Sequence, residues 1–359
     1  MVAAGSRGKV DQIRQVLATP LMAEDSQDRI IPIPITRSYV EGLDSQEYWA
    51  AGYGVRKGIV GRSYQTAKPG ALAKELLASV SDVVVTSTKH EPAAITLPTD
   101  RADDISDRFL AAAAVGKNGK VLAKKGQLLT ADMVPRLRKG GAKTVSVYTP
   151  LNSEAPGGGI PAKAFGLTER GTVPKPGDNV GILSGQAITE PLSQMTMRAF
   201  HSGGTIGAGA NIPEGFDRVK QLLEFPHTVK GKATLAEEKG KVEKISKAPA
   251  GGYYVDVSGV SHYIPHGRNV TVKKGQRVAS GDALSDGVIK PQELAEYKGL
   301  EETQKYMVDE LQKSLKGTRR KYIETIVAGM TNRGRVIDPG DHADTVSYTH
   351  LTLPTTPYV

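Results

Sequence analysis

The chain has 359 residues, a net charge of +9, and hydrophobic and charged fractions of 39% and 24% that are usual for folded proteins. The sequence contains no cysteine, which excludes disulfides and thiolate zinc sites, and no apolar run reaches the roughly 20 residues of a membrane helix. It also begins without the apolar core of a signal peptide, so we expect a cytoplasmic protein. The basic balance weakly favours a polyanionic partner, whereas the aromatic fraction of 5% disfavours a base-stacking binder of single strands.

The first half of the chain alternates helical patterns with irregular stretches. We expect a short helix near residues 12–17 and a long, mostly helical stretch over 44–85. Pro69 lies in that stretch and is expected to bend the helix or to remove one hydrogen bond. Residues 90–175 are expected to be mixed, with a short strand at 144–148, and 178–202 to be helical again.

The second half predicts a loop, a β module and two helices. The loop at 203–215 is rich in glycine, and a helix is expected at 217–224. Residues 228–290 alternate and turn often, as a small all-β module does. In the first of two later helices one apolar face is shared by Met307, Val308, Leu311 and Leu315. The second covers about 321–330, and the whole pattern predicts a multi-segment α+β protein.

One segment has the side chains for chemistry. Gln194, Met197, Arg198 and His201 are spaced i, i+3, i+4 and i+7, so in a helix they line one face. That face offers an amide, an apolar surface, a fixed cation and an imidazole, a set that suits a nucleotide. The glycine-rich loop directly after it is typical of a mobile lid. On the pattern alone, a solvated face with a structural histidine is the more frequent explanation.

A resemblance to a known family favours nucleotide binding over a solvated face for these residues. Residues 194–204 read Gln-Met-Thr-Met-Arg-Ala-Phe-His-Ser-Gly-Gly, and 177–182 read Gly-Asp-Asn-Val-Gly-Ile. Both stretches resemble the trigger-loop region of the largest subunit (β′) of bacterial multisubunit RNA polymerases. The resemblance implies that Gln194 and Met197 bind substrate and that Arg198 and His201 are catalytic.

Two further blocks resemble the same family in the same order. Tyr53-Gly54-Val55-Arg56-Lys57-Gly58, continued by Gln65-Thr66-Ala67, resembles the bridge helix, which crosses the active cleft. By resemblance, the nucleic-acid contacts fall on Arg56, Lys57, Thr66 and Ala67, although a solvated face explains the basic pair equally well. Gly5-Ser6-Arg7-Gly8 resembles a segment that supports the trigger loop, so Arg7 is expected near the substrate triphosphate, unless it is merely a flexible terminal arginine.

The β module carries a fourth match. Residues 270–278 and 281–287 resemble the small sandwich-barrel hybrid region of β′. Taken alone they also resemble a biotinyl or lipoyl carrier domain, but the modified Met-Lys hairpin of such carriers is missing. The expected divisions are 1–41 (support for the trigger loop), 42–86 (bridge-helix region), 87–170 (jaw-like mixed region), 171–227 (trigger loop and flanking helices), 228–290 (small β module), 291–342 (C-terminal helices) and 343–359 (a non-native tail resembling a translated sequencing adapter).

The resemblance implies a part of a DNA-directed RNA polymerase, a nucleotidyltransferase that is not active as this chain alone. The family holds its catalytic Mg²⁺ in an Asn-Ala-Asp-Phe-Asp-Gly-Asp motif that this sequence lacks, so the metal is expected on other polymerase segments, and no metal ligand is assigned here. Three positions of the family's four-cysteine zinc site fall on Glu154, Pro161 and Ala164, so zinc is not expected and the lineage is expected to be divergent, of phage type.

The resemblance also implies the partners. They are the rest of β′, the β subunit and other polymerase subunits, template DNA, RNA and a nucleoside triphosphate, with no membrane. The alternative is a non-catalytic function: the chain would then be a nucleic-acid-binding or assembly module of a polymerase-like complex.

Overall fold

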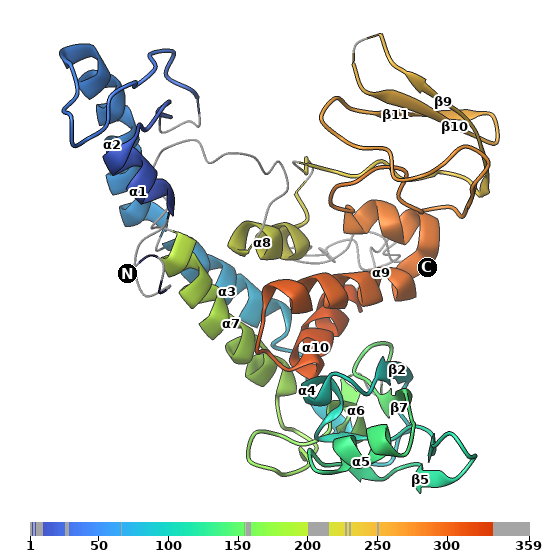
Figure 1. The fold of residues 1–359 in the computed structure, drawn as a ribbon. Helices are drawn as coiled ribbons and strands as arrows, with labels where there is room; N and C mark the ends of the chain where they lie inside the picture. The colour runs from blue at the N-terminus through green and yellow to red at the C-terminus, as the bar shows by residue number, and fades with distance from the viewer. Residues whose placement is uncertain are drawn as a thin grey trace, which may run out of the picture. The chain divides into compact units, whose positions relative to one another are not determined.

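The computed structural model describes residues 2, 4, 10–25, 29–65, 67–153, 155, 159–199, 215–226, 228–229, 231–249 and 251–332. These residues divide between two compact units, one within 1–73 and 189–216 and the other within 74–188 and 217–359. Helices and small sheets occur together, which confirms the α+β class (Figure 1). Within the described ranges, no helix is long and apolar enough to span a bilayer.

The first unit is built on two helices from the N-terminal segment. Helix α1 (Val10–Leu17) confirms the short helix expected there, and α2 (Ser45–Gln65) confirms the first part of the long helical stretch. The loop between them folds back on itself through single β-bridges between Leu21 and Ile35 and between Glu24 and Ile30. A small apolar core of Ala23, Ile35, Ala50 and Ala51 holds this loop against α2.

The helical stretch continues as α3 (Ala67–Ser79). Pro69 is its third residue. Whether it bends the helix or removes a hydrogen bond depends on the junction just before α3, so this expectation stays a prediction. Residue 66, which joins α2 to α3, lies outside the described residues.

The second unit contains a small module of short strands. Strand β2 (Ala94–Pro98) pairs antiparallel with β7 (Thr144–Tyr148), the strand expected from the sequence. Around this pair lie α4 (Ala102–Ile105), α5 (Met133–Lys139), α6 (Ala162–Phe165) and the strand pairs β3 (Arg108–Phe109) with β6 (Leu128–Leu129) and β4 (Ala114–Val115) with β5 (Val121–Ala123). Their shared core includes Ile105, Leu110, Leu129 and Val147, all fully buried. Strand β1 (Val85–Ser87) runs parallel to β8 (Ile160–Pro161).

The expected β module is confirmed as a four-stranded sheet. Its order is β11-β10-β9-β12, with β9 (Gly240–Lys247), β10 (Tyr253–Val257), β11 (Val260–Ile264) and β12 (Arg277–Val278). Ser258 and Gly259 join β10 to β11 and both have positive φ, 49° and 83°. Two such residues make the tight turn whose twist matches a hairpin. Alternate side chains of the strands, such as Val255 and Val257, form the module's core.

Three helices complete the second unit. Helix α8 (Phe216–Glu224) precedes the β module, and α9 (Pro291–Ser314) and α10 (Arg320–Thr331) follow it side by side (Figure 1). A kink at Gly299, with φ of 80°, divides α9. The apolar face predicted for this helix is confirmed, because Met307, Val308, Leu311 and Leu315 are all fully buried. Every residue of α10 is buried, so its polar side chains need partners inside the protein.

Helix α7 (Val180–Ala199) confirms the helix expected at 178–202. The end of α3 packs closely against α7 and against α10. A Cβ added at Gly181 would lie 1.9 Å from the carbonyl oxygen of Val80, and one at Gly329 only 3.0 Å from a methyl of Val80. No side chain fits at Gly181 without moving backbone. The first turns of α7 are therefore held tightly to the helix that precedes β1.

Candidate functional site

The predicted substrate-binding face lies at the end of α7, and the structure describes only part of it. Gln194 is exposed. Met197 and Arg198 belong to the helical backbone of α7, but their side chains are not among those described. His201 lies outside the described residues, as do Arg7 and Thr66, so the predicted roles of these three stay predictions.

The predicted nucleic-acid contacts on α2 separate into two kinds. Lys57 is half-buried, and its Nζ lies 2.6 Å from Oε2 of Glu24 in the loop that covers α2. Its ammonium group thus ties that loop to the helix. Arg56 and Ala67 are exposed, and their predicted contacts with nucleic acid stay predictions.

An open apolar groove of about 500 Å³ runs beside Arg56. The turn before α2 and one face of α2 line it, with Tyr39, Leu43, Tyr48 and Val55 among the lining residues. Close by, the Trp49 side chain is 71% exposed. This surface was not predicted from the sequence, although Tyr48, Trp49 and Tyr53 lie close together in a chain whose aromatic fraction is only 5%.

A capping box fixes the start of α2. The backbone N–H of Glu47 donates to Asp44 Oδ1 (2.9 Å), and the Asp44 N–H donates back to Glu47 Oε2 (3.3 Å). The other Glu47 oxygen accepts hydrogen bonds from the hydroxyl and N–H of Thr36 at 2.7 and 2.8 Å. These bonds from Thr36, followed by the backbone bonds from Asp44 and Arg37, lower the pKa of Glu47 to about 2.

The low pKa of Glu47 predicts how the first unit responds to acid. A carboxylate with a depressed pKa stabilises the fold fully above its ordinary pKa of 4.5, and that stabilisation is lost as pH falls toward 2. Glu47→Gln should therefore unfold the first unit more readily near neutral pH, and the difference from wild type should vanish near pH 2. Fluorescence of Trp49, the one tryptophan of the chain, reports on this unit. The exposed Glu75 provides the control Glu75→Gln; an equal effect of both variants would contradict a special role for Glu47.

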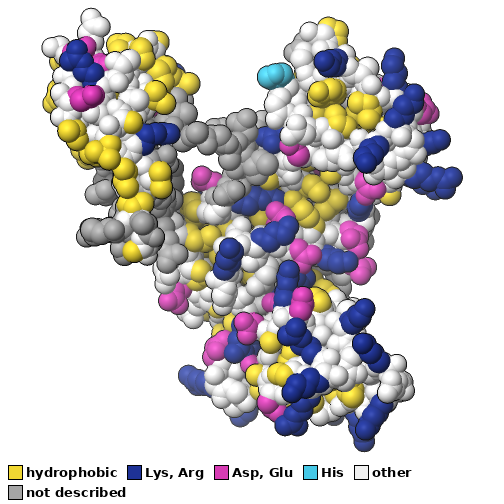
Figure 2. Space-filling model, viewed as in Figure 1, with side chains coloured by type: hydrophobic (Ala, Val, Ile, Leu, Met, Phe, Trp, Pro, Cys, Tyr) yellow, Lys and Arg dark blue, Asp and Glu magenta, His cyan; other side chains and the backbone are white. Residues whose placement is uncertain are grey.

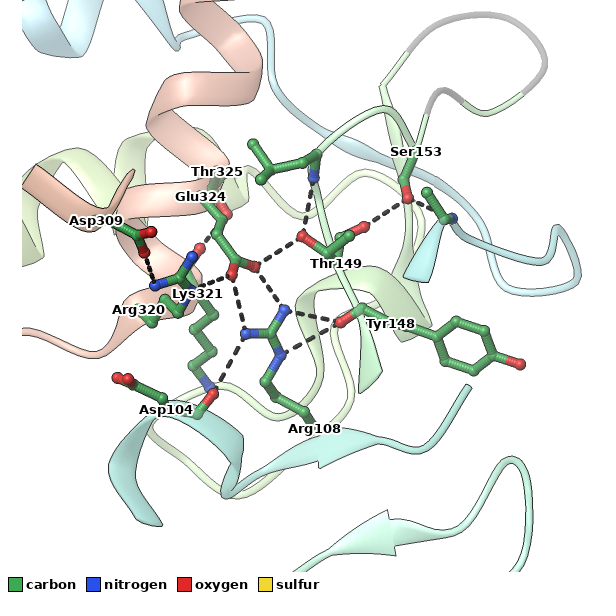
Figure 3. A network of polar contacts seen from close by, with 12 residues as sticks. Asp104, Arg108, Tyr148, Thr149, Ser153, Asp309, Arg320, Lys321, Glu324 and Thr325 are labelled. Atoms are coloured by element: carbon green, nitrogen blue, oxygen red, sulfur yellow. Dashed lines mark hydrogen bonds and ion pairs between the residues drawn. The ribbon is translucent and has the colours of Figure 1, made fainter. Parts of the chain in front are cut away.

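A buried ionic network joins α10 to the strand module. The carboxylate of Glu324 is fully buried. It accepts hydrogen bonds from Arg108 Nη2 at 2.5 Å, Thr149 Oγ1 at 2.8 Å and Arg320 Nε at 3.0 Å. Arg108 also donates to the carbonyl of Tyr148 at 2.8 Å. Figure 3 shows the Glu324 carboxylate between the two guanidinium groups. Burial alone would raise the pKa of Glu324, but Arg108, Arg320 and the Thr149 hydroxyl hold it below its ordinary value.

Another buried cation, Lys321, lies beside this network. Lys321 donates to the carbonyl of Leu167, and its Nζ lies 5.2 Å from the ring centre of Phe165 and 5.4 Å from that of Tyr322. Burial, helped by the nearby charge of Arg319, lowers the pKa of Lys321 to about 8. Because these charges are all committed to partners inside the fold, the network anchors α10 and offers no open site for a ligand.

Comparison with known proteins assigns the chain to a family. The family model described as RNA polymerase Rpb1, domain 5, matches residues 42–250. The chain belongs to this family. The matched range contains α2, α3, the strand module, α7 and α8.

Curated relatives of the chain are β′ subunits of DNA-directed RNA polymerase. Over 95% of its length the chain is 32% identical to the β′ subunit of Acetivibrio thermocellus. It is 30% and 31% identical over the same share to those of Clostridioides difficile and Symbiobacterium thermophilum. The chain spans about 31% of the length of the first of these relatives.

The chain's residues do not fit the zinc site that the resemblance implies for most bacterial members. Pro161 and Ala164, two of the three positions in question, are buried and offer no metal-binding atom, and Glu154 lies outside the described residues. Across the ranges that the structure covers, no three His, Asp or Glu side chains gather to hold a metal. In place of ligands, Ile160, Ala162 and Phe165 pack tightly, and Ser153 Oγ accepts the Ala93 N–H at 2.7 Å.

Metal removal should therefore leave the protein's stability unchanged. Dialysis of the full chain against 1,10-phenanthroline is expected to release no stoichiometric zinc and to leave Tm where it was. Ser153→Ala provides the sensitivity control, because it removes the acceptor of the partly buried Ala93 N–H and should lower Tm. One zinc per chain, with a fall in Tm on its removal, would contradict the metal-free packing.

Proposed function

We propose that the chain is a working part of a DNA-directed RNA polymerase largest subunit, in which α2 and α3 serve as the bridge helix and residues 194–215 as the trigger loop. The observation that carries this proposal is the family match over 42–250, a range that covers α2, α3 and residues 194–215. The partners are then the remaining β′ segments, the β and other subunits, template DNA, RNA and a nucleoside triphosphate, in the cytoplasm. The bound Mg²⁺, held by carboxylates of other segments, supplies the main charge stabilisation of nucleotidyl transfer.

In this proposal the chain's own residues close the site on the incoming nucleotide. Met197 packs on the base, Gln194 offers its amide to the sugar or base, and Arg198 reaches the phosphates with a planar donor fork. His201 donates a proton to the leaving pyrophosphate or a hydrogen bond that positions it. Residue Arg7 adds a second guanidinium near the triphosphate.

Two structural features support this proposal. Helix α7 continues to Ala199, so Gln194, Met197 and Arg198 lie on a helical backbone with the spacing of a single face. At its other end the close contact of Gly181 with Val80 fixes the first turns of α7. A helix anchored at one end, followed by the glycine-rich sequence of 203–215, has the properties that a lid needs.

Reconstitution tests the proposed function. The chain is co-expressed with two components: the β′ piece that carries the aspartate motif, and the β subunit. RNA extension is then measured on a primed template. We expect extension only when this chain is present. Stable co-purification without extension would favour the non-catalytic assembly module instead, and extension of equal rate without the chain would contradict both.

A further inference from the structure

A buried arginine holds the start of helix α8. The surface of α9 carries exposed charges of both signs, such as Glu302 and Lys305, and Figure 2 shows such charges interspersed over the middle of this face. Arg218, the third residue of α8, is buried instead. Its Nη2 donates to the Tyr306 hydroxyl at 2.7 Å and lies 3.2 Å from Glu310 Oε2, both on α9. Because an unpaired charge is costly inside a protein, these contacts fix α8 to α9.

The hydroxyl of Tyr306 joins three parts of the second unit. Besides the bond from Arg218, it accepts the N–H of Ile289 at 3.2 Å and donates to the Ile289 carbonyl at 3.3 Å. Ile289 lies just before α9, where the chain leaves the β module. Burial raises the pKa of Tyr306, so its hydroxyl stays protonated at neutral pH and keeps its donor. Tyr306 therefore connects α8, α9 and the end of the β module.

The rest of α8 is fixed along its length. Leu222 is fully buried, and at the far end Gln292 Nε2 donates to the carbonyl of Phe225 at 3.2 Å. The boundary between the two compact units falls between residues 216 and 217, just before Arg218. Gly215, the residue before α8, has φ of 61°, a conformation that suits glycine. Arg218 is thus a fixed polar contact at the point where the chain enters α8.

We propose that Arg218, held by Tyr306 and Glu310, is a positioning residue for the proposed trigger loop. It fixes the helix to which the C-terminal end of residues 194–215 is attached, as close packing at Gly181 fixes the first turns of α7. A segment between two fixed ends has less conformational freedom to lose when it folds than one with a loose end. The inference rests on the proposed function and adds that nucleotide addition depends on a residue outside the predicted substrate-binding face.

A matched pair of tyrosine variants tests this anchor in the reconstituted polymerase. Tyr306→Phe removes the hydroxyl that holds Arg218, whereas Tyr322→Phe, on α10, removes a hydroxyl that donates to Glu169. Rapid-quench kinetics at saturating nucleotide is expected to show addition slowed about tenfold by Tyr306→Phe and less than about twofold by Tyr322→Phe. Arg218→Met should slow addition more than Tyr306→Phe. Arg218→Lys should restore part of the rate, because it keeps a cation opposite Glu310.

A double variant separates positioning from a general loss of stability. Gly204→Pro obstructs helical extension of the loop, so Tyr306→Phe should have no further effect in that background if the anchor acts through the loop. Equal rates for Tyr306→Phe and Tyr322→Phe would overturn the inference and leave the proposed function intact. So would an undiminished effect of Tyr306→Phe in a Gly204→Pro background that is itself slow. An unchanged rate for Gly204→Pro alone would contradict the proposed function, and the inference with it.

Discussion

Replacing Glu324 by glutamine is expected to lower the free energy of unfolding of the second unit by about 3–5 kcal/mol, because it leaves buried guanidinium charge without its partner. Arg108 is 1% exposed and Arg320 is 4% exposed, so water does not compensate either of them well. Thr149 would also lose a charged acceptor for its hydroxyl. Urea unfolding of the full chain, followed by circular dichroism, measures the change.

The double variant Arg108→Met/Glu324→Leu separates this charge effect from the effect of altered packing. Apolar side chains of similar size can replace a buried ion pair at little cost, so the double variant should be clearly more stable than Glu324→Gln alone. Asp132→Asn, which breaks the exposed pair with Arg136, is the matched surface control and should change stability by less than about 1 kcal/mol. A small destabilisation by Glu324→Gln, comparable to that of the control, would contradict the role given to the network.

In a reconstituted polymerase, Arg198→Ala is expected to slow single-nucleotide addition by about 10²–10³, the usual effect of removing one preorganised donor from developing charge. His201→Leu should cost about 10²–10⁴ if the imidazole acts as a general acid, and His201→Gln less, because its amide still donates a hydrogen bond. Rapid-quench kinetics at saturating nucleotide measures each rate.

The exposed Arg101, in the strand module, provides the control Arg101→Ala, which should leave the rate unchanged.

Gly204→Pro tests separately whether the loop must fold, because proline obstructs the helical extension of the loop. Rates close to wild type for His201→Leu and His201→Gln alike would remove any role for the imidazole, and an unchanged rate for Gly204→Pro would contradict lid folding.

Local patterns were enough to predict most of the secondary structure. The face of Met307, Val308, Leu311 and Leu315 follows from helical periodicity, because a period of 3.6 residues needs no knowledge of the partner. The capping box is also predictable from the sequence, since Asp44 and Glu47 have its spacing ahead of a helix.

Long-range pairing could not be predicted in this way. Arg108 and Glu324 are 216 positions apart, and nothing near either residue indicates the other. Arg320, Lys321 and Glu324 suggest a solvated face for α10, yet every residue of that helix is buried. For the candidate site, the spacing of Gln194, Met197 and Arg198 gave only a helix face. Its assignment to nucleotide binding came from resemblance, because periodicity carries no information about a ligand.

Photocrosslinking tests most directly whether this chain closes on the incoming nucleotide. A nucleoside triphosphate with a photoreactive thio group on its base is added to the reconstituted elongation complex and irradiated, and the adduct is mapped by mass spectrometry. The proposal predicts an adduct within residues 194–201, formed with the template-matched nucleotide and much weaker with a mismatched one. Adducts confined to other segments, or equal yields with matched and mismatched nucleotides, would contradict it.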